Sequence, residues 1–152
     1  MLNQDYKEML QLLQEQTVEH LLVGAYALAA QGYPRSTIDI DIWVNPTPEN
    51  SSKIYKALVQ FGAPLNEIEE NTFTNKGIIF QIGVAPRRID LITEITGDIE
   101  FEDAMARSTQ VNIDDVPLNV LSIEDLIKNK DATGRPKDIE DVNILRKHLK
   151  QL

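Results

Sequence analysis

Residues 37–44 read Thr-Ile-Asp-Ile-Asp-Ile-Trp-Val and place two aspartates inside a run that otherwise suits a buried β-strand. Side chains of a strand alternate between the two faces of a sheet. Asp39 and Asp41 therefore share one face, while the isoleucines between them point into a core. Two carboxylates held this close repel each other unless a cation lies between them. Hard divalent ions such as Mg²⁺ prefer oxygen ligands of this kind, so the run predicts a cation site on a rigid strand.

Residues 88–92, Arg-Ile-Asp-Leu-Ile, form a second predicted strand with one aspartate, Asp90, among apolar neighbours. Three carboxylates from two strands could hold two metal ions ~3.5–4 Å apart, the arrangement used in phosphoryl and nucleotidyl transfer. We expect two Mg²⁺ ions, with Mn²⁺ as a substitute. The alternative is a surface strand whose aspartates face water. Aspartate is rare in strands, and the flanking isoleucines and Trp43 favour the functional interpretation.

Composition limits the class of protein. The 152 residues suit one domain spanning residues 1–152, and no apolar run approaches the ~18 residues needed to span a bilayer. Cysteine is absent, which excludes thiolate zinc sites. Residues 1–6 lack the basic and apolar regions of a signal peptide, so we expect a cytoplasmic protein. The net charge of −9 argues against non-specific binding to nucleic acid, because contacts to phosphate need lysine and arginine.

Apolar periodicity and turn residues predict an α+β domain with a mixed, partly antiparallel sheet flanked by helices. The short connection between residues 77–82 and 88–92 predicts an antiparallel hairpin, and the polar residues 65–76 predict a loop. Predicted strands cover residues 20–23, 37–44, 77–82, 88–92, 111–113 and 118–121. Predicted helices cover residues 4–16, 25–30, 48–61, 101–107, 123–130 and 139–145, with Thr47 and Ser122 as N-caps.

Residues 23–42 combine two motifs: Gly24-Ala25 at a predicted strand-to-helix turn, and the acidic pair about a dozen residues later. With Asp90 as a third acid on a later strand, this pattern resembles the signature of the polymerase-beta-like nucleotidyltransferase superfamily. Residues 126–130 and 135–141 are similar to the closing motif of its small single-domain prokaryotic members. Those members include the group related to abortive-infection and toxin–antitoxin nucleotidyltransferases.

The resemblance implies a minimal nucleotidyltransferase fold. Such a protein moves a nucleoside monophosphate from a nucleoside triphosphate, such as ATP, to an acceptor hydroxyl. It also implies that Asp39, Asp41 and Asp90 hold the metal ions, and that Asp90 is placed to accept the proton of the attacking hydroxyl. The acceptor could be a protein side chain, the end of a transfer RNA or a small molecule. An acidic surface suits a cationic acceptor better than RNA, and a partner protein could supply the rest of its binding surface.

A triphosphate would meet Gly24 and the amides at the start of the helix that begins at Ala25. The family usually has serine or glycine at the position of Ala25; alanine removes one side-chain contact and leaves the backbone contribution. The structural alternative for Gly24 is a junction that needs a small residue. The structural alternative for Lys137 is a surface ion pair with Asp141. The further predicted nucleotide contacts are Arg35, Ser36, Thr37, Lys130 and Lys137.

Other functions are compatible with parts of the pattern. A catalytically weak or inactive module of the same fold could be a binding partner in a toxin–antitoxin or regulatory complex. Ala25 favours that alternative and the three aspartates disfavour it. A metal-dependent nuclease would not explain the Gly24 turn, and a glycosyltransferase with an Asp-x-Asp pair needs a longer nucleotide-binding domain. The nucleotide base, the acceptor and the oligomeric state stay open at this level.

Overall fold

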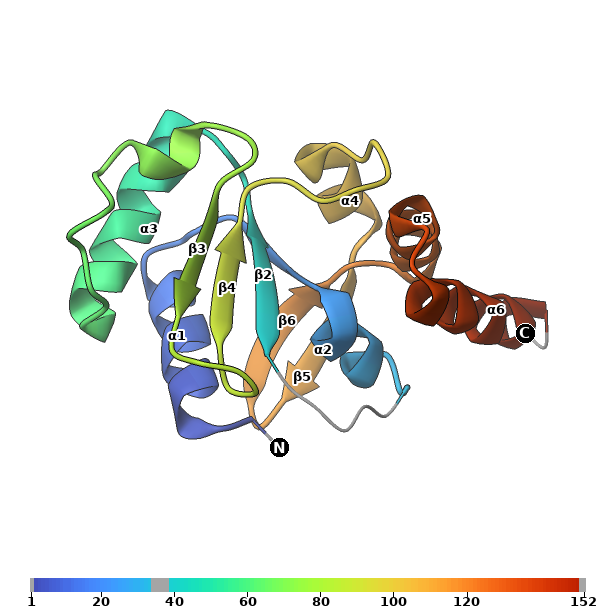
Figure 1. The fold of residues 1–152 in the computed structure, drawn as a ribbon. Coiled ribbons are helices and arrows are strands. Elements are labelled where there is room, and N and C mark those ends of the chain that lie inside the picture. Colours follow the sequence, from blue (N-terminus) through green and yellow to red (C-terminus); the bar gives the residue numbers. More distant parts are fainter. Residues whose placement is uncertain (1, 34–38, 151–152) are drawn as a thin grey trace.

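The computed structural model describes residues 2–33 and 39–150, and within them six strands form one mixed sheet with helices around it (Figure 1). The strands are β1 (His20–Val23), β2 (Ile40–Val44), β3 (Ile79–Ile82), β4 (Ile89–Ile92), β5 (Thr109–Ile113) and β6 (Val116–Val120). The helices are α1 (Gln4–Glu15), α2 (Gly24–Ala30), α3 (Pro48–Phe61), the 3₁₀ turn η1 (Thr72–Thr74), α4 (Phe101–Arg107), α5 (Ile123–Thr133) and α6 (Pro136–Lys150). The α+β class and the mixed sheet are confirmed.

The sheet has the strand order β3-β4-β2-β1-β6-β5. Strands β3 and β4 form an antiparallel hairpin, as predicted, and β5 with β6 forms a second one. Strand β1 pairs antiparallel with β2, whereas β2–β4 and β1–β6 run parallel. The parallel pairing of β2 with β4 sets Asp41 directly beside Asp90, two of the three predicted metal ligands.

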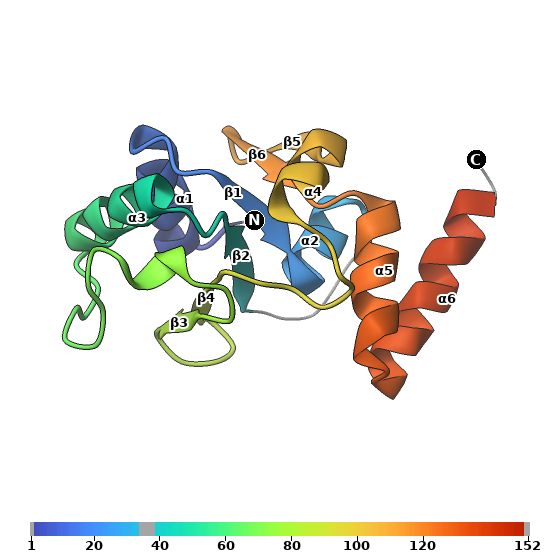
Figure 2. The same cartoon turned by 90° about the horizontal axis from the view of Figure 1, so that it is seen from above.

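Strand β2 carries the alternation that its sequence predicts. Ile40, Ile42 and Val44 are fully buried in the hydrophobic core, and Asp41 and Trp43 occupy the opposite side of the strand. Helix α2 contacts both β1 and β2, while α1 contacts α3. Helices α5 and α6 pack on each other as a hairpin that extends away from the sheet (Figures 1 and 2).

Helix ends follow the predicted capping signals. The Thr47 hydroxyl accepts a hydrogen bond from the Asn50 amide at the start of α3, and Gly62, in the left-handed region at φ +85°, ends that helix. The Ser122 hydroxyl accepts from the amide of Asp125 and caps α5. The Asp125 carboxylate pairs with the Arg107 guanidinium of α4 at 2.9 Å, which ties α4 to α5.

One expectation is modified. The predicted loop 65–76 contains η1, where Phe73 is fully buried. The apolar residues of this stretch, Leu65, Ile68 and Phe73, follow neither helical nor strand spacing, so only the packing reveals that Ile68 and Phe73 are buried. On α6, Ile139 and Ile144 are 43% and 51% exposed, whereas Val142 and Leu145 are buried. In the described part of the chain, no helix is both long enough and apolar enough to cross a membrane.

Candidate active site

The three predicted acids come together on β2 and β4. Asp41 and Asp90 are direct neighbours in the parallel register, and Asp39 precedes the first residue of β2. The carboxylate of Asp39 accepts a hydrogen bond from the backbone amide of Arg88 at 2.9 Å, which fixes it beside the start of β4. Two strands therefore hold the three carboxylates in one place, as the sequence predicts.

Arg88 lies among these carboxylates. Its Nε is 2.7 Å from Asp90 Oδ1 and its Nη2 is 3.0 Å from Asp90 Oδ2, a forked contact. The same Nη2 is 3.3 Å from Asp39 Oδ2. Hydrogen bonding to Asp90 raises the pKa of Arg88 above its usual range. Sequence reasoning missed this residue, although its position two residues before Asp90 puts both side chains on one face of the strand.

Asp41 lies in an environment that disfavours its ionised form. Burial, followed by the charge of Asp90 and a hydrogen bond with it, raises the pKa of Asp41 to about 7, and the positive charge of Arg88 opposes this rise only partly. Desolvation and a neighbouring like charge both disfavour an ionised carboxyl. The site therefore favours either a proton or a further cation beside Asp41.

The donor set suits a hard divalent ion. Carboxylate oxygens are the ligands that Mg²⁺ and Mn²⁺ prefer, and Asp39, Asp41 and Asp90 supply them from adjacent strands. Within residues 2–33 and 39–150, no three His, Cys, Asp or Glu side chains are already spaced to hold a metal, and the guanidinium of Arg88 occupies the position of a counter-cation. An ion bound by the three aspartates would therefore require Arg88 to move aside.

Gly24 packs directly against Asp41. It has φ +71°, and a Cβ added to it would lie 2.4 Å from Asp41 Oδ2 and 3.3 Å from Asp41 Cγ. Val23, the residue before it, pairs with Asp41 in the antiparallel register of β1 and β2. Glycine is thus required here for a reason that the sequence did not reveal: the start of α2 touches the acid itself.

Lys130, one of the predicted nucleotide contacts, is paired with carboxylates of a neighbouring helix. Lys130 is 7% exposed, and its Nζ lies 3.3 Å from Asp138 Oδ1 and 3.2 Å from Asp141 Oδ2, which joins α5 to α6. Burial alone would raise the pKa of Asp138, but hydrogen bonds from Thr133 and Arg135, with the charge of Lys130, hold it below its usual range. The suggested partner of Lys137, Asp141, is therefore bound by Lys130.

Three predicted nucleotide contacts, Arg35, Ser36 and Thr37, lie outside the described residues. Lys137 is exposed on α6, and Ala25 is half-buried in the first turn of α2. The predictions that these five residues and Lys130 contact a nucleotide stay predictions. Lys130 already serves the α5–α6 packing.

Comparison with known proteins assigns the family. A sequence profile described as a nucleotidyl transferase family of unknown function matches residues 2–152. The chain belongs to this family. The expected nucleotidyltransferase fold and the enzyme class are thereby confirmed, whereas the toxin–antitoxin subgroup stays a prediction. No functionally curated protein matches the chain in sequence.

Solved structures of nucleotidyltransferases share the fold of this family member. A candidate nucleotidyltransferase from Thermotoga maritima aligns over 100% of this chain and 97% of its own, with a TM-score of 0.62 and 17% identity. The antibiotic-resistance factor ANT(2'')-Ia in solution aligns over 95% and 82%, with a TM-score of 0.64 and 18% identity. Its crystal structure with adenylyl-2''-tobramycin aligns over 95% and 87%, with a TM-score of 0.62 and 18% identity.

Proposed function

We propose that this protein transfers a nucleoside monophosphate from a nucleoside triphosphate to an acceptor hydroxyl in a metal-dependent reaction at Asp39, Asp41 and Asp90. The observation that carries the proposal is the convergence of these carboxylates on β2 and β4, with the Gly24 turn in contact with Asp41. Family membership supports nucleotidyl transfer as the reaction class. The whole chain, residues 1–152, would act as one nucleotidyltransferase domain.

The three aspartates would hold two Mg²⁺ ions, or Mn²⁺ in their place. Bound there, the ions would neutralise charge on the entering and leaving oxygens of the α-phosphorus. The acceptor oxygen forms a bond to the α-phosphorus, the bond to the β-phosphate oxygen breaks, and pyrophosphate leaves. Asp90 accepts the hydroxyl proton. Arg88, released from the carboxylates, would be free to bind a phosphate through its forked guanidinium.

The triphosphate would lie against the Gly24-Ala25 turn. The remaining proposed nucleotide contacts are Arg35, Ser36, Thr37, Lys130 and Lys137. Lys130 is almost fully buried and paired with two carboxylates of α6, so it could reach a phosphate only if those ion pairs are kept or exchanged. ATP is the first nucleotide to test, and a cytoplasmic location is part of the proposal.

Binding and turnover together test this proposal. We expect Mg²⁺-dependent binding of nucleoside triphosphate, measured by calorimetry, to fall about 100-fold or more in Asp39→Asn/Asp41→Asn. Glu8→Gln/Asp115→Asn is the matched control, since it removes the same two charges from exposed positions, and asparagine is tolerated at position 115, where φ is +66°. Tight binding that persists unchanged in the double variant would refute the two-metal site.

A second candidate function is an inactive or weakly active module in a toxin–antitoxin or regulatory complex. Ala25, which lacks the usual serine hydroxyl, favours it. Incubation of the protein and its co-purified partners with labelled ATP, CTP, GTP and UTP, followed by mass spectrometry, separates the two. Label on a protein, RNA or small molecule supports the transferase, and nucleotide binding without label on any of them supports the module.

A further inference from the structure

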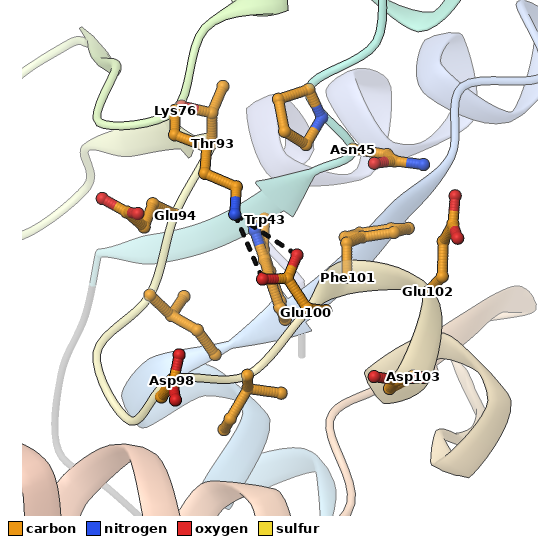
Figure 3. A pocket seen from close by; sticks show the side chains of 13 residues that line it. Trp43, Asn45, Lys76, Thr93, Glu94, Asp98, Glu100, Phe101, Glu102 and Asp103 are labelled. Carbon is orange, nitrogen blue, oxygen red and sulfur yellow. Dashed lines mark hydrogen bonds and ion pairs between the residues drawn. The ribbon is translucent and has the colours of Figure 1, made fainter.

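A cavity of about 420 Å³ lies along β2 beyond the catalytic acids (Figure 3). The end of β2, the segment after β4 and the start of α4 enclose it. Trp43 in its wall is two residues after Asp41, so both side chains lie on the same face of the strand, about 7 Å apart along it. The cavity is therefore a neighbour of the active site on the same side of the sheet.

The lining of this cavity, which we call the Trp43 pocket, is strongly acidic. One lysine, Lys76, stands against five carboxylates, and its Nζ lies 3.2 and 3.3 Å from the two carboxylate oxygens of Glu100. Both side chains of that ion pair are more than half exposed, so the pair is weak and readily exchanged. The carboxylates are those of Glu94, Asp98, Glu100, Glu102 and Asp103.

Trp43 adds a second, independent signal. It is 2% exposed and packs edge-to-face on Phe101, with ring centroids 5.1 Å apart. Its indole nitrogen has no hydrogen-bond partner among the described residues, although buried donors normally have one. Figure 3 shows that nitrogen pointing toward the Lys76–Glu100 pair, into the pocket. The indole N–H is thus a buried donor that is left without an acceptor at the aromatic wall of the pocket.

From these features we infer that the Trp43 pocket binds the acceptor substrate, and that this substrate is a small organic polycation bearing hydroxyl groups. Its ammonium groups pair with the carboxylates and displace Lys76 from Glu100. An oxygen of the same molecule accepts from the Trp43 indole, and the aromatic wall favours a cation beside it. A cavity of this size suits a small molecule rather than a protein surface. The inference rests on the proposed transferase function and specifies its acceptor.

Binding can be measured without catalysis, because Trp43 is the only tryptophan of the chain and its fluorescence reports on this pocket. We expect tobramycin, a hydroxylated polyamine, to change the emission in the absence of nucleotide and metal. Spermine, which has charge without hydroxyls, should bind more weakly, and the neutral sugar maltotriose should not bind. Equal binding of maltotriose and tobramycin would overturn the inference.

Charge-neutral variants give the matched comparison. Glu94→Gln/Asp98→Asn/Glu102→Gln should weaken tobramycin binding about 10-fold or more, since it removes three of the carboxylates that pair with the ammonium groups. Asparagine is suited to position 98, where φ is +54°. The control triple variant changes the net charge equally at exposed sites elsewhere and should shift affinity less than about 2-fold; it consists of Glu8→Gln, Glu67→Gln and Glu140→Gln. Equal weakening by both triple variants would refute the pocket.

The substitution Lys76→Met should have the opposite effect on tobramycin affinity. Because Lys76 competes with the ligand for Glu100, its removal should tighten tobramycin binding by about 3-fold or more, whereas damage to the fold would weaken it. Weaker or unchanged binding in Lys76→Met would contradict the inference. A peptide of nine lysines could bind tighter than tobramycin with the same dependence on Glu94 and Asp98. That result would overturn the inference and assign the pocket to a basic protein segment.

The two proposals fail separately. Asp39→Asn/Asp41→Asn should abolish transfer and leave tobramycin fluorescence titrations unchanged. If no transfer is found but the Trp43 pocket binds the polycation as described, only the proposed function fails. If transfer to any acceptor is found and the pocket triple variant leaves its KM unchanged, the inference fails and the function stands.

Discussion

Substitution of Gly24 by alanine tests its contact with Asp41, on which the proposed catalytic site depends. The new Cβ would lie 2.4 Å from Asp41 Oδ2, 3.3 Å from Cγ and 3.4 Å from Cβ of the same residue. The nearest distance is impossible for real atoms, so the Asp41 carboxylate must rotate away from the turn. Gly62→Ala is the matched control, because Gly62 also has positive φ, at +85°, but has nothing within 4 Å of an added Cβ.

The two substitutions share the cost of placing an L-residue in the left-handed region, about 1–2 kcal/mol. Gly24→Ala adds the overpacking of a buried contact, about 1–3 kcal/mol. We therefore expect the free energy of unfolding to fall by about 1 kcal/mol in Gly62→Ala and by about 3 kcal/mol in Gly24→Ala. Urea denaturation monitored by circular dichroism measures both values.

A double-mutant cycle isolates the clash from other effects. In an Asp41→Ala background the carboxylate is absent, so Gly24→Ala should cost no more than Gly62→Ala, and the coupling energy should be at least about 1 kcal/mol. Nucleotidyl transfer should fall about 100-fold or more in Gly24→Ala and stay within 2-fold of the parent in Gly62→Ala. A cost of Gly24→Ala that is the same with and without the Asp41 carboxylate would refute the proposed contact.

Three further predictions concern the charges. Arg88→Met should lower the stability of the metal-free protein at pH 8 by about 2 kcal/mol, because the active-site carboxylates lose a charged hydrogen-bond donor; an unchanged urea midpoint would contradict this. Burial raises the pKa of Asp41 from 3.8 to about 7, so its contribution to stability is full below pH 4 and is lost as pH rises through about 7, by roughly 4 kcal/mol at most. Mg²⁺ should consequently raise the melting temperature more at pH 8 than at pH 5, and equal increments would exclude Asp41 as a ligand. Lys130→Met should cost about 3–5 kcal/mol by leaving buried carboxylates without their shared cation. Neutral partners, Asp138→Asn/Asp141→Asn, should restore much of that loss, and nucleotide affinity restored with stability would show that Lys130 acts only through packing.

The distribution of acids was predictable because strand periodicity is local. Alternation along residues 39–44 already puts Asp39, Asp41 and Trp43 on one face and the isoleucines on the other. The capping residues Thr47 and Ser122 and the β3–β4 hairpin were predictable for the same reason, since each depends on a few neighbouring residues. Such signals need no knowledge of what packs against them.

Partners of the charged side chains were not predictable in this way. Sequence spacing suggested that Lys137 pairs with Asp141, but Asp141 is buried and bound by Lys130 from another helix. The Arg88 guanidinium pairs with the carboxylates of Asp39 and Asp90, which could equally bind a metal ion. A long flexible side chain can reach many acids, and only the tertiary arrangement decides which one it meets.

From the sequence alone came an α+β fold and the face of β2 that carries the acids, because both depend on short-range periodicity. Tertiary structure decided the rest: the parallel register that sets Asp41 against Asp90, the contact of Gly24 with Asp41, and the acidic cavity beside Trp43. These features join segments that are 17 to about 60 residues apart in the chain. Their juxtaposition depends on how the strands pair and pack, which no local pattern specifies.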